Sequence, residues 1–275
     1  MPFDNAYEAI TEENDHTHWA FGTGFDDPLA GIDTTVPTGM DRDSLATHCL
    51  MLGDDALIMS HRLAEWCTNA PELEDEVALA NIALDLLGQA RLLLSRSAQV
   101  SGGGTEDTLA YLRDEHEFRN VRLAELPRGD FAHEIVRLLV FSTWRLAILT
   151  RLVDSPDPVL AAIAAKGVKE LAYHRDYAAG WTVRLGDGTG LSHERMSAAV
   201  ADVWPYVAEL FEPHEIEPRA EFDDVIAQVF DAAGLVVPDS APAERAGRDG
   251  GHTEAMAPLL AEMQSVARAH PDATW

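Results

Sequence analysis

The stretch that decides the fold is residues 71–104, PELEDEVALANIALDLLGQARLLLSRSAQVSGGG. It opens with Pro71 and several acidic residues, which suit a first helical turn because the amino-terminal end of the helix dipole is positive. It closes at three consecutive glycines. At roughly 28 residues, a helix of this length favours a long bundle. Apolar residues at spacings of three and four predict its packed face, namely Leu73, Val77, Ala80, Leu84, Leu87 and Leu94.

Similar signals predict further helices on both sides of this stretch. Ser44 is a plausible N-cap for a long helix that continues to about Cys67. Asp157 and Gly186 suit the two ends of another. No alternating strand pattern occurs. We therefore expect an all-α fold, a ferritin-like four-helix bundle with additional C-terminal helices. Besides residues 72–100, the predicted helices are 44–67, 106–119, 131–153, 158–185, 193–211, 221–233 and 253–269.

The predicted domain organisation is an extension followed by one helical domain. Residues 1–43 are acidic, dotted with glycine and proline, and without clear periodicity, so we expect a partly irregular N-terminal extension. Residues 44–275 form the ferritin-like domain. The N-terminus lacks the basic and apolar regions of a signal peptide, and no apolar run approaches the length of a membrane span. We expect a cytoplasmic protein without a membrane partner.

The charge balance of the chain is strongly acidic. It has 47 Asp and Glu residues against 20 Lys and Arg, a formal net charge of −27. Only two of the basic residues are lysines, Lys166 and Lys169. Such a surface suits a cytoplasm of molar salt, where screening shortens the Debye length to about 3 Å and self-repulsion is tolerable. We therefore expect a halophilic protein. The composition argues against nucleic-acid binding, which needs basic surface.

A ferritin-like bundle that held two irons would need specific ligands. These are one Glu from each of two helices and a Glu-x-x-His pair from each of the other two, because residues i and i+3 share a helix face. The third long helix offers no acid in its middle, where Ser142 and Thr143 stand. None of the acids three residues before a histidine is in the middle of a long helix; such pairs include Glu13/His16, Asp130/His133 and Asp249/His252.

Two places resemble incomplete copies of the ligand motif. Asp85 is followed at i+3 by Gly88, and Glu170 by Tyr173, with His174 one place late. The first long helix offers other acids, but the ligand set lacks at least one carboxylate and one imidazole. We expect a degenerate bundle site without metal and without catalytic residues. Its members would be Asp85, Lys169, Glu170, Tyr173 and His174; the acids of the first helix are Asp54, Asp55 and Glu65.

We expect Asp85 and Glu170 to approach each other between their helices, with Lys169, His174 or Tyr173 as partners. Two buried carboxylates without a cation would repel each other. A residual mononuclear metal site is the alternative. The two lysines fall on one helix either by coincidence or because a compact charge is needed there. Asn81, Asp85 and Gln89 form a polar stripe that could face the bundle interior or a partner subunit.

Several motifs resemble one family, the C subunit of the phenylacetyl-CoA epoxidase (ring 1,2-epoxidase). The resemblance covers about residues 45–275, and the motif within the second long helix is specific. The C-terminal residues His252-Thr-Glu254, Leu260-Ala-Glu-Met-Gln264 and Trp275 fit as well. The main motifs are Leu52-Gly-Asp-Asp-Ala, Arg62-Leu-Ala-Glu-Trp-Cys67, Ala70-Pro-Glu-Leu-Glu74, residues 80–91 (ANIALDLLGQAR) and Lys169-Glu-Leu-Ala-Tyr-His174.

The resemblance implies a place in a multicomponent monooxygenase. In that family the di-iron site and the CoA thioester are held by a homologous catalytic subunit, and the C subunit pairs with it as a structural component. Small accessory subunits and a flavin/iron–sulfur reductase complete the system. The expected function is therefore a non-catalytic subunit in aerobic phenylacetate catabolism, with no cofactor in this chain. The alternative is a free-standing ferritin-like oxygenase or oxidase with unusual metal ligands.

Overall fold

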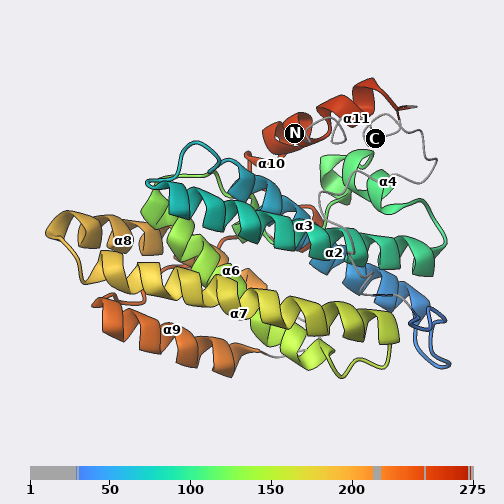
Figure 1. The fold of residues 1–275 in the computed structure, drawn as a ribbon, viewed down its shortest axis with the longest axis horizontal. Helices are drawn as coiled ribbons and strands as arrows, with labels where there is room; N and C mark the ends of the chain where they lie inside the picture. The colour runs from blue at the N-terminus through green and yellow to red at the C-terminus, as the bar shows by residue number, and fades with distance from the viewer. Residues whose placement is uncertain (1–28, 30, 213–217, 245, 272, 274–275) are drawn as a thin grey trace, which may run out of the picture.

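The computed structural model describes residues 29, 31–212, 218–244, 246–271 and 273. This part of the chain is helical and contains no strand, which confirms the all-α prediction (Figure 1). Most of the predicted N-terminal extension, with Glu13 and His16, lies outside the described residues. The elements are α2 (Arg42–Ala64), α3 (Leu73–Ser101), α4 (Glu106–Tyr111), η1 (Glu115–Glu117), α5 (Arg122–Glu125), α6 (Phe131–Leu152), α7 (Pro158–Gly186), α8 (Gly190–Val203), η2 (Trp204–Tyr206), η3 (Ala208–Phe211), α9 (Arg219–Ala233), η4 (Gly247–Asp249), α10 (Met256–Met263) and α11 (Ser265–Ala269).

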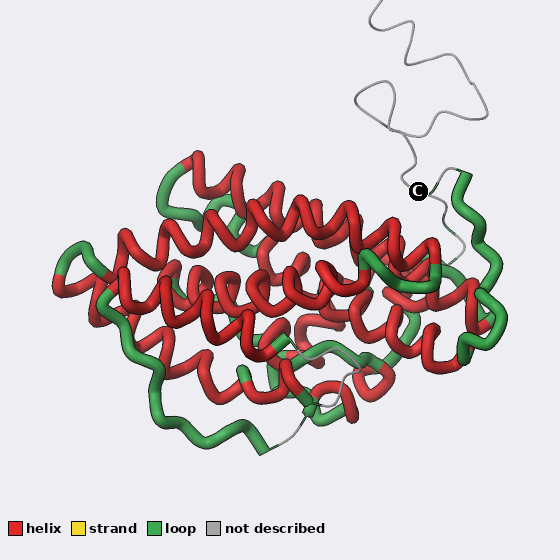
Figure 2. The backbone as a smooth tube through the Cα atoms, turned by 90° about the horizontal axis from the view of Figure 1, so that it is seen from below, coloured by secondary structure: helices red, strands yellow, loops and turns green. Residues whose placement is uncertain are grey.

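Four long helices make up the body of the molecule as two hairpins. Helices α2 and α3 form one antiparallel pair and α6 and α7 the other, and the pairs meet where α3 lies beside α7 (Figures 1 and 2). Helices α8 and α9 pack against α6 and α7, and α10 packs beside η1. The four long helices are thus those that the sequence predicted as the bundle.

Helix ends follow the local sequence signals closely. Asp157 caps α7, accepting a 2.8 Å hydrogen bond from the Leu160 amide, as predicted. The prediction that Ser44 caps the first long helix is wrong. Asp41 caps α2, and its side chain accepts a hydrogen bond from the Ser44 amide at 2.7 Å. The single helix predicted over 106–119 is also wrong. That segment divides into α4 and η1, each started by its own capping residue.

The packed face of α3 differs from the predicted one. Of the six residues in the predicted stripe, only Leu94 is buried, while Leu73, Val77, Leu84 and Leu87 are exposed. Spacings of three and four identify a face but not its direction, and α3 is apolar on two sides. The buried face includes Leu79, Ile82, Ala83, Leu86, Ala90 and Leu93 as well as Leu94.

Helix α3 is also the one described helix that is long and apolar enough to cross a membrane, by length and composition alone. Less than half of its most apolar window is buried, and its buried face packs against α2 and α7. Core helices of water-soluble bundles pass the same test, so this composition is weak evidence for a membrane span.

Glycines allow close contacts between helices, and two of these lie within the bundle. A Cβ on Gly53 would stand 2.8 Å from a Leu94 side-chain carbon, so a larger residue there would separate α2 from α3. A Cβ on Gly167 would meet Leu149 at 2.6 Å and the Gln89 amide carbon at 3.3 Å. Gly167 therefore lets α7 lie close to the side chain of Gln89.

A buried ion pair joins the two hairpins at one end of the bundle. The Arg96 guanidinium of α3 donates to both carboxylate oxygens of Asp157, and neither side chain is exposed. The third guanidinium nitrogen of Arg96, Nη1, donates to the Thr34 carbonyl at 2.7 Å. Asp157 thus caps α7 and also neutralises a buried arginine.

We expect Asp157→Ala to lower the free energy of unfolding by about 3–5 kcal/mol, because it leaves the buried Arg96 charge without its partner. Asp130→Ala is the matched control, since Asp130 caps α6 from an exposed position. Its loss costs about 1 kcal/mol. Denaturant unfolding in molar salt measures both values. Equal effects would show that the buried charge contributes nothing beyond the cap.

Candidate functional site

The centre of the bundle is occupied by an arginine. Arg145 lies in the middle of α6 with no exposed surface. Its Nε donates to the Gln89 side-chain oxygen at 3.0 Å, and its Nη1 donates to the Leu52 carbonyl at 3.0 Å. One guanidinium thereby links α6 to both α3 and α2.

Arg145 keeps its positive charge in this apolar setting. Burial lowers the pKa of Arg145 to about 10, while the nearby charges of Asp55 and Glu170 favour the protonated form. At neutral pH the group is therefore still a cation. Its Nη2 is buried and has no hydrogen-bond partner among the described protein atoms.

A chain of polar contacts continues from Arg145 to the surface. The Gln89 amide nitrogen donates to Glu170 at 2.9 Å, and Lys166 pairs with the other oxygen of Glu170 from one turn away on α7. Gln89 is buried, Glu170 is half-buried and Lys166 is exposed. The contacts run from the Leu52 carbonyl through Arg145 and Gln89 to Glu170, so they connect all four long helices.

Asp85 and His174 form a second contact between α3 and α7. The His174 Nε2 lies 3.0 Å from Asp85 Oδ2, with the imidazole fully buried and the carboxylate partly exposed. The His174 Nδ1 is buried without a partner among the described protein atoms. Asn81 is exposed and Gln89 is buried, so the predicted polar stripe runs from the surface into the interior.

Three of the five residues of the predicted degenerate site take part in two neighbouring contacts between α3 and α7, and two are exposed. Asp85 contacts His174, whereas Glu170 contacts Gln89 and Lys166, and the two acids have no cation in common. Of the three expected partners Lys169, His174 and Tyr173, His174 contacts Asp85, whereas Lys169 faces solvent. Tyr173 is exposed as well.

The buried acids of α2 are already engaged by arginines. Asp55 accepts hydrogen bonds from both terminal nitrogens of Arg248, at 2.9 and 2.8 Å. It accepts a third from the Val121 amide at 2.8 Å. Asp54 is likewise paired with both terminal nitrogens of Arg113. Glu65, nearer the end of the helix, pairs with Arg62 at 2.6 Å.

This donor set does not fit a di-iron centre. In the described ranges, no group of three or more His, Cys, Asp or Glu side chains is placed to hold a metal ion. A di-iron bundle needs several carboxylates with free oxygen lone pairs around a common point. Here the carboxylates of Asp54, Asp55 and Glu170 already accept hydrogen bonds from arginines or amides. The guanidinium at the centre of the bundle belongs to Arg145.

Arg145 was not among the predicted site residues, although the sequence carries a signal for it. Within FSTWRLAIL, residues 141–149, it is the single charged residue in the most apolar part of α6. A lone cation in a helix that is otherwise buried needs acceptors from neighbouring helices. Ser142 satisfies its hydroxyl within its own helix by donating to the Leu138 carbonyl at 2.6 Å.

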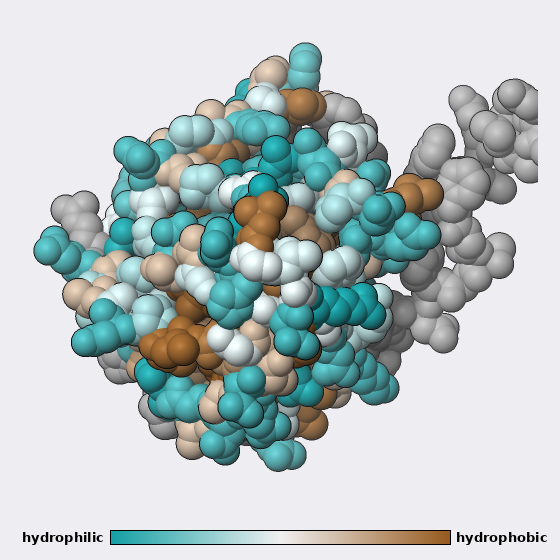
Figure 3. All heavy atoms as spheres, turned by 90° about the vertical axis from the view of Figure 1, so that its left-hand side faces the viewer, coloured by the Kyte–Doolittle hydropathy of each residue, from teal (hydrophilic) through white to brown (hydrophobic). Residues whose placement is uncertain are grey.

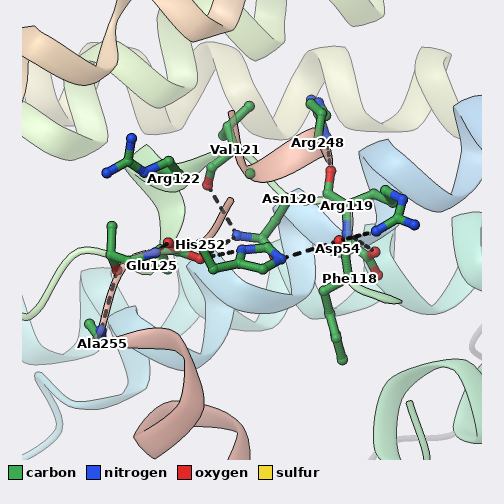
Figure 4. A network of polar contacts seen from close by, with 12 residues as sticks. Asp54, Phe118, Arg119, Asn120, Val121, Arg122, Glu125, Arg248, His252 and Ala255 are labelled. Carbon is green, nitrogen blue, oxygen red and sulfur yellow. Dashed lines mark hydrogen bonds and ion pairs between the residues drawn. The ribbon is translucent and has the colours of Figure 1, made fainter. Parts of the chain in front are cut away.

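A second polar network anchors the C-terminal segment to the bundle (Figure 4). His252 lies 2.8 Å from a Glu125 oxygen through Nδ1 and 3.2 Å from the Phe118 carbonyl through Nε2. Both partners are hydrogen-bond acceptors, so both ring nitrogens must carry protons to satisfy them. Burial opposes this charge, but the hydrogen bond with Glu125 prevails and raises the pKa of His252.

Glu209 holds the same segment from the other side. Its carboxylate accepts hydrogen bonds from the backbone amides of Gly247, at 2.7 Å, and Arg122, at 3.1 Å. Burial raises the pKa of Glu209 to about 7, against these two hydrogen bonds. Two groups with raised pKa values, Glu209 and His252, thus flank η4 and Arg248, which pairs with Asp55 of α2.

We expect Arg145→Met to lower the free energy of unfolding by about 1–3 kcal/mol, because it leaves the side-chain oxygen of Gln89 buried without a donor. Lys169→Met, at an exposed position, should change it by less than about 0.5 kcal/mol. Chemical denaturation of both variants measures the difference. An Arg145→Met protein as stable as wild type would contradict this role for the arginine.

The C-terminal network should make stability depend on pH. Folded Glu209 and His252 both bind protons more tightly than in the unfolded chain, so stability falls as pH rises. For Glu209 the fall spans its ordinary value of 4.5 to about 7, and for His252 it lies above 6.5. We expect Glu209→Gln with His252→Gln to reduce the loss of unfolding free energy between about pH 5 and pH 8 by about 1 kcal/mol or more. Denaturant melts at both pH values measure it; an unchanged loss would refute it.

The fold and interior together define a class of protein, an all-helical bundle whose centre is closed by an arginine-centred hydrogen-bond network. The family model described as Phenylacetic acid catabolic protein matches residues 32–275. The chain is also similar to the C subunit of the 1,2-phenylacetyl-CoA epoxidase of Escherichia coli (strain K12). The two are 45% identical over 247 residues, which cover 85% of this chain and 100% of that relative. The chain therefore belongs to the phenylacetic acid catabolic protein family.

Proposed function

We propose that this chain is a structural, non-catalytic subunit of a multicomponent phenylacetyl-CoA 1,2-epoxidase in aerobic phenylacetate catabolism. The observation that carries the proposal is the Arg145 guanidinium at the centre of the bundle, hydrogen-bonded to Gln89 and the Leu52 carbonyl. A fixed positive charge would repel iron cations, and the nearby acids are already paired. The relation to the Escherichia coli epoxidase protein supports the choice of complex.

In this proposal the chain contributes a rigid helical body and no reacting group. A homologous ferritin-like catalytic subunit would hold the di-iron cofactor and the aryl-CoA thioester. Small accessory subunits and a reductase would complete the system, all within the cytoplasm. The acidic surface would keep the subunit soluble in molar salt, because close screening removes most of the repulsion among its charges.

A residual metal site is the second candidate function. Asp85 and His174 meet at 3.0 Å, and Gly88 on the same helix as Asp85 has no heavy atom within 4 Å of the place its Cβ would occupy. One carboxylate and one imidazole provide only two donors, fewer than the four or more that iron, zinc or manganese usually takes in proteins. A free-standing metalloenzyme would depend on bound metal, whereas the structural subunit would not. Metal analysis of the purified chain therefore distinguishes the two.

The expected behaviour in a reconstituted system follows from these roles. The isolated chain, supplied with reductase, NADPH and phenylacetyl-CoA, should produce no epoxide and contain less than stoichiometric metal. Co-expressed with the catalytic subunit, it should co-purify and support turnover. Arg145→Lys, which keeps a cation, should preserve turnover of the complex wherever the variant folds. Epoxide formation by the isolated chain would contradict the proposal.

A further inference from the structure

Helix α3 presents an apolar face that no part of the described chain covers. Leu73, Val77, Leu84 and Leu87 are 70, 52, 64 and 42% exposed. Their spacings of four, seven and three residues place them along one side of the helix. Tyr173 on α7, which lies beside α3, is 55% exposed. We call these five residues the α3 face. Several large apolar side chains exposed along one side of a helix are typical of an interaction site.

A hollow of about 460 Å³ continues the α3 face at the end where α3 begins and α7 ends. Its walls include Tyr173, Tyr177 and Trp181 of α7. The Tyr177 hydroxyl donates to Asp75 at 2.9 Å, so this wall is held in place by α3. Figure 3 looks onto this end of the molecule, where brown apolar groups stand among hydrophilic surface.

The charges around the hollow select the chemistry of its occupant. One cation lines the hollow, Arg184, whose guanidinium lies 5.3 Å from the centre of the Trp181 ring. Four carboxylates line it as well, those of Glu72, Glu74, Asp75 and Asp176. An aromatic wall with a carboxylate rim suits a lysine or, better, an arginine side chain, which can stack and form ion pairs at once. A phosphate or other anion would be repelled.

A second copy of this chain is a poor occupant of the α3 face, because its own acidic residues would be repelled by the carboxylates around the hollow. Two copies joined through the α3 face in a symmetric dimer would bring their acidic rims together, and each chain carries a net charge of −27. Like charges in contact weaken association. The occupant therefore needs an apolar stripe to cover the leucines and a basic residue for the hollow.

We propose that the α3 face seats an amphipathic helix of the catalytic partner, whose apolar residues cover Leu84 and Leu87 and whose arginine or lysine enters the hollow beside Asp176. This inference rests on the proposed function, since it names the surface by which the subunit joins its complex. It also accounts for the apolar composition of α3 on the side away from the core. The same residues would then be buried in the complex.

The test uses the double variant Leu84→Glu/Leu87→Glu of the full chain. Both positions are exposed, so thermal melts of the isolated chain should match wild type. Binding to the purified catalytic subunit, measured by calorimetry in molar salt, should weaken at least about 30-fold, as loss of a central apolar contact does in known interfaces. Leu191→Glu, 60% exposed on α8, is the matched control and should bind like wild type.

A charge variant tests the hollow separately. Asp176→Lys should weaken binding, and its effect should shrink as salt rises because exposed charges are screened, whereas the effect of the leucine variant should persist. If wild type binds and the leucine variant binds equally well, this inference fails while the proposed function stands. If wild type does not bind the catalytic subunit, the proposed function fails. A homodimer of the isolated chain that the leucine variant dissociates, seen by light scattering, would overturn the choice of partner.

Discussion

The arrangement of the four long helices depends on the hydrogen-bond acceptors that they supply to one buried cation, Arg145. Arg145 lies inside an apolar bundle, where an isolated charge would be very costly, so its acceptors must come from the surrounding helices. Gln89 of α3 and the backbone of α2 supply them, and Gly167 lets α7 approach closely enough for Gln89 to reach Glu170. These contacts fix the rotation of the four long helices about their axes, which leucine packing alone specifies less strictly. A buried polar network of this kind contributes specificity more surely than net stability.

The polar network also relates this chain to bundles that hold metal. A bundle interior that gathers carboxylates requires positive charge, from iron or from a side chain. In this chain Arg145, Arg113 and Arg248 supply it, each beside acids of the interior. The same bundle architecture can thus persist without a metal. This is the physical basis for the non-catalytic role that we propose for the chain.

Much of the fold could be predicted from sequence because helix ends are local events. Pro158 after Asp157 set the start of α7, and the glycines after Ser101 set the end of α3. The orientation of α3 could not be predicted, because it is apolar both toward the core and along Leu84 and Leu87. For the site, the sequence places Asp85 and His174 on two neighbouring helices, but it does not specify the rotation of α7, which decides that His174 faces inward and Lys169 faces solvent. Arg145 needed three-dimensional information, since its acceptors are 56 and 93 residues away in the chain.

The central claim is that a guanidinium, and no iron, occupies the interior of this bundle. Crystals of the chain grown with excess ferrous iron, measured with X-rays on both sides of the iron absorption edge, test it directly. The account predicts electron density for the Arg145 guanidinium between Gln89 and the Leu52 carbonyl, and no anomalous peak among the four long helices. An iron peak beside Asp85, His174 or Glu170, with Arg145 displaced, would contradict it.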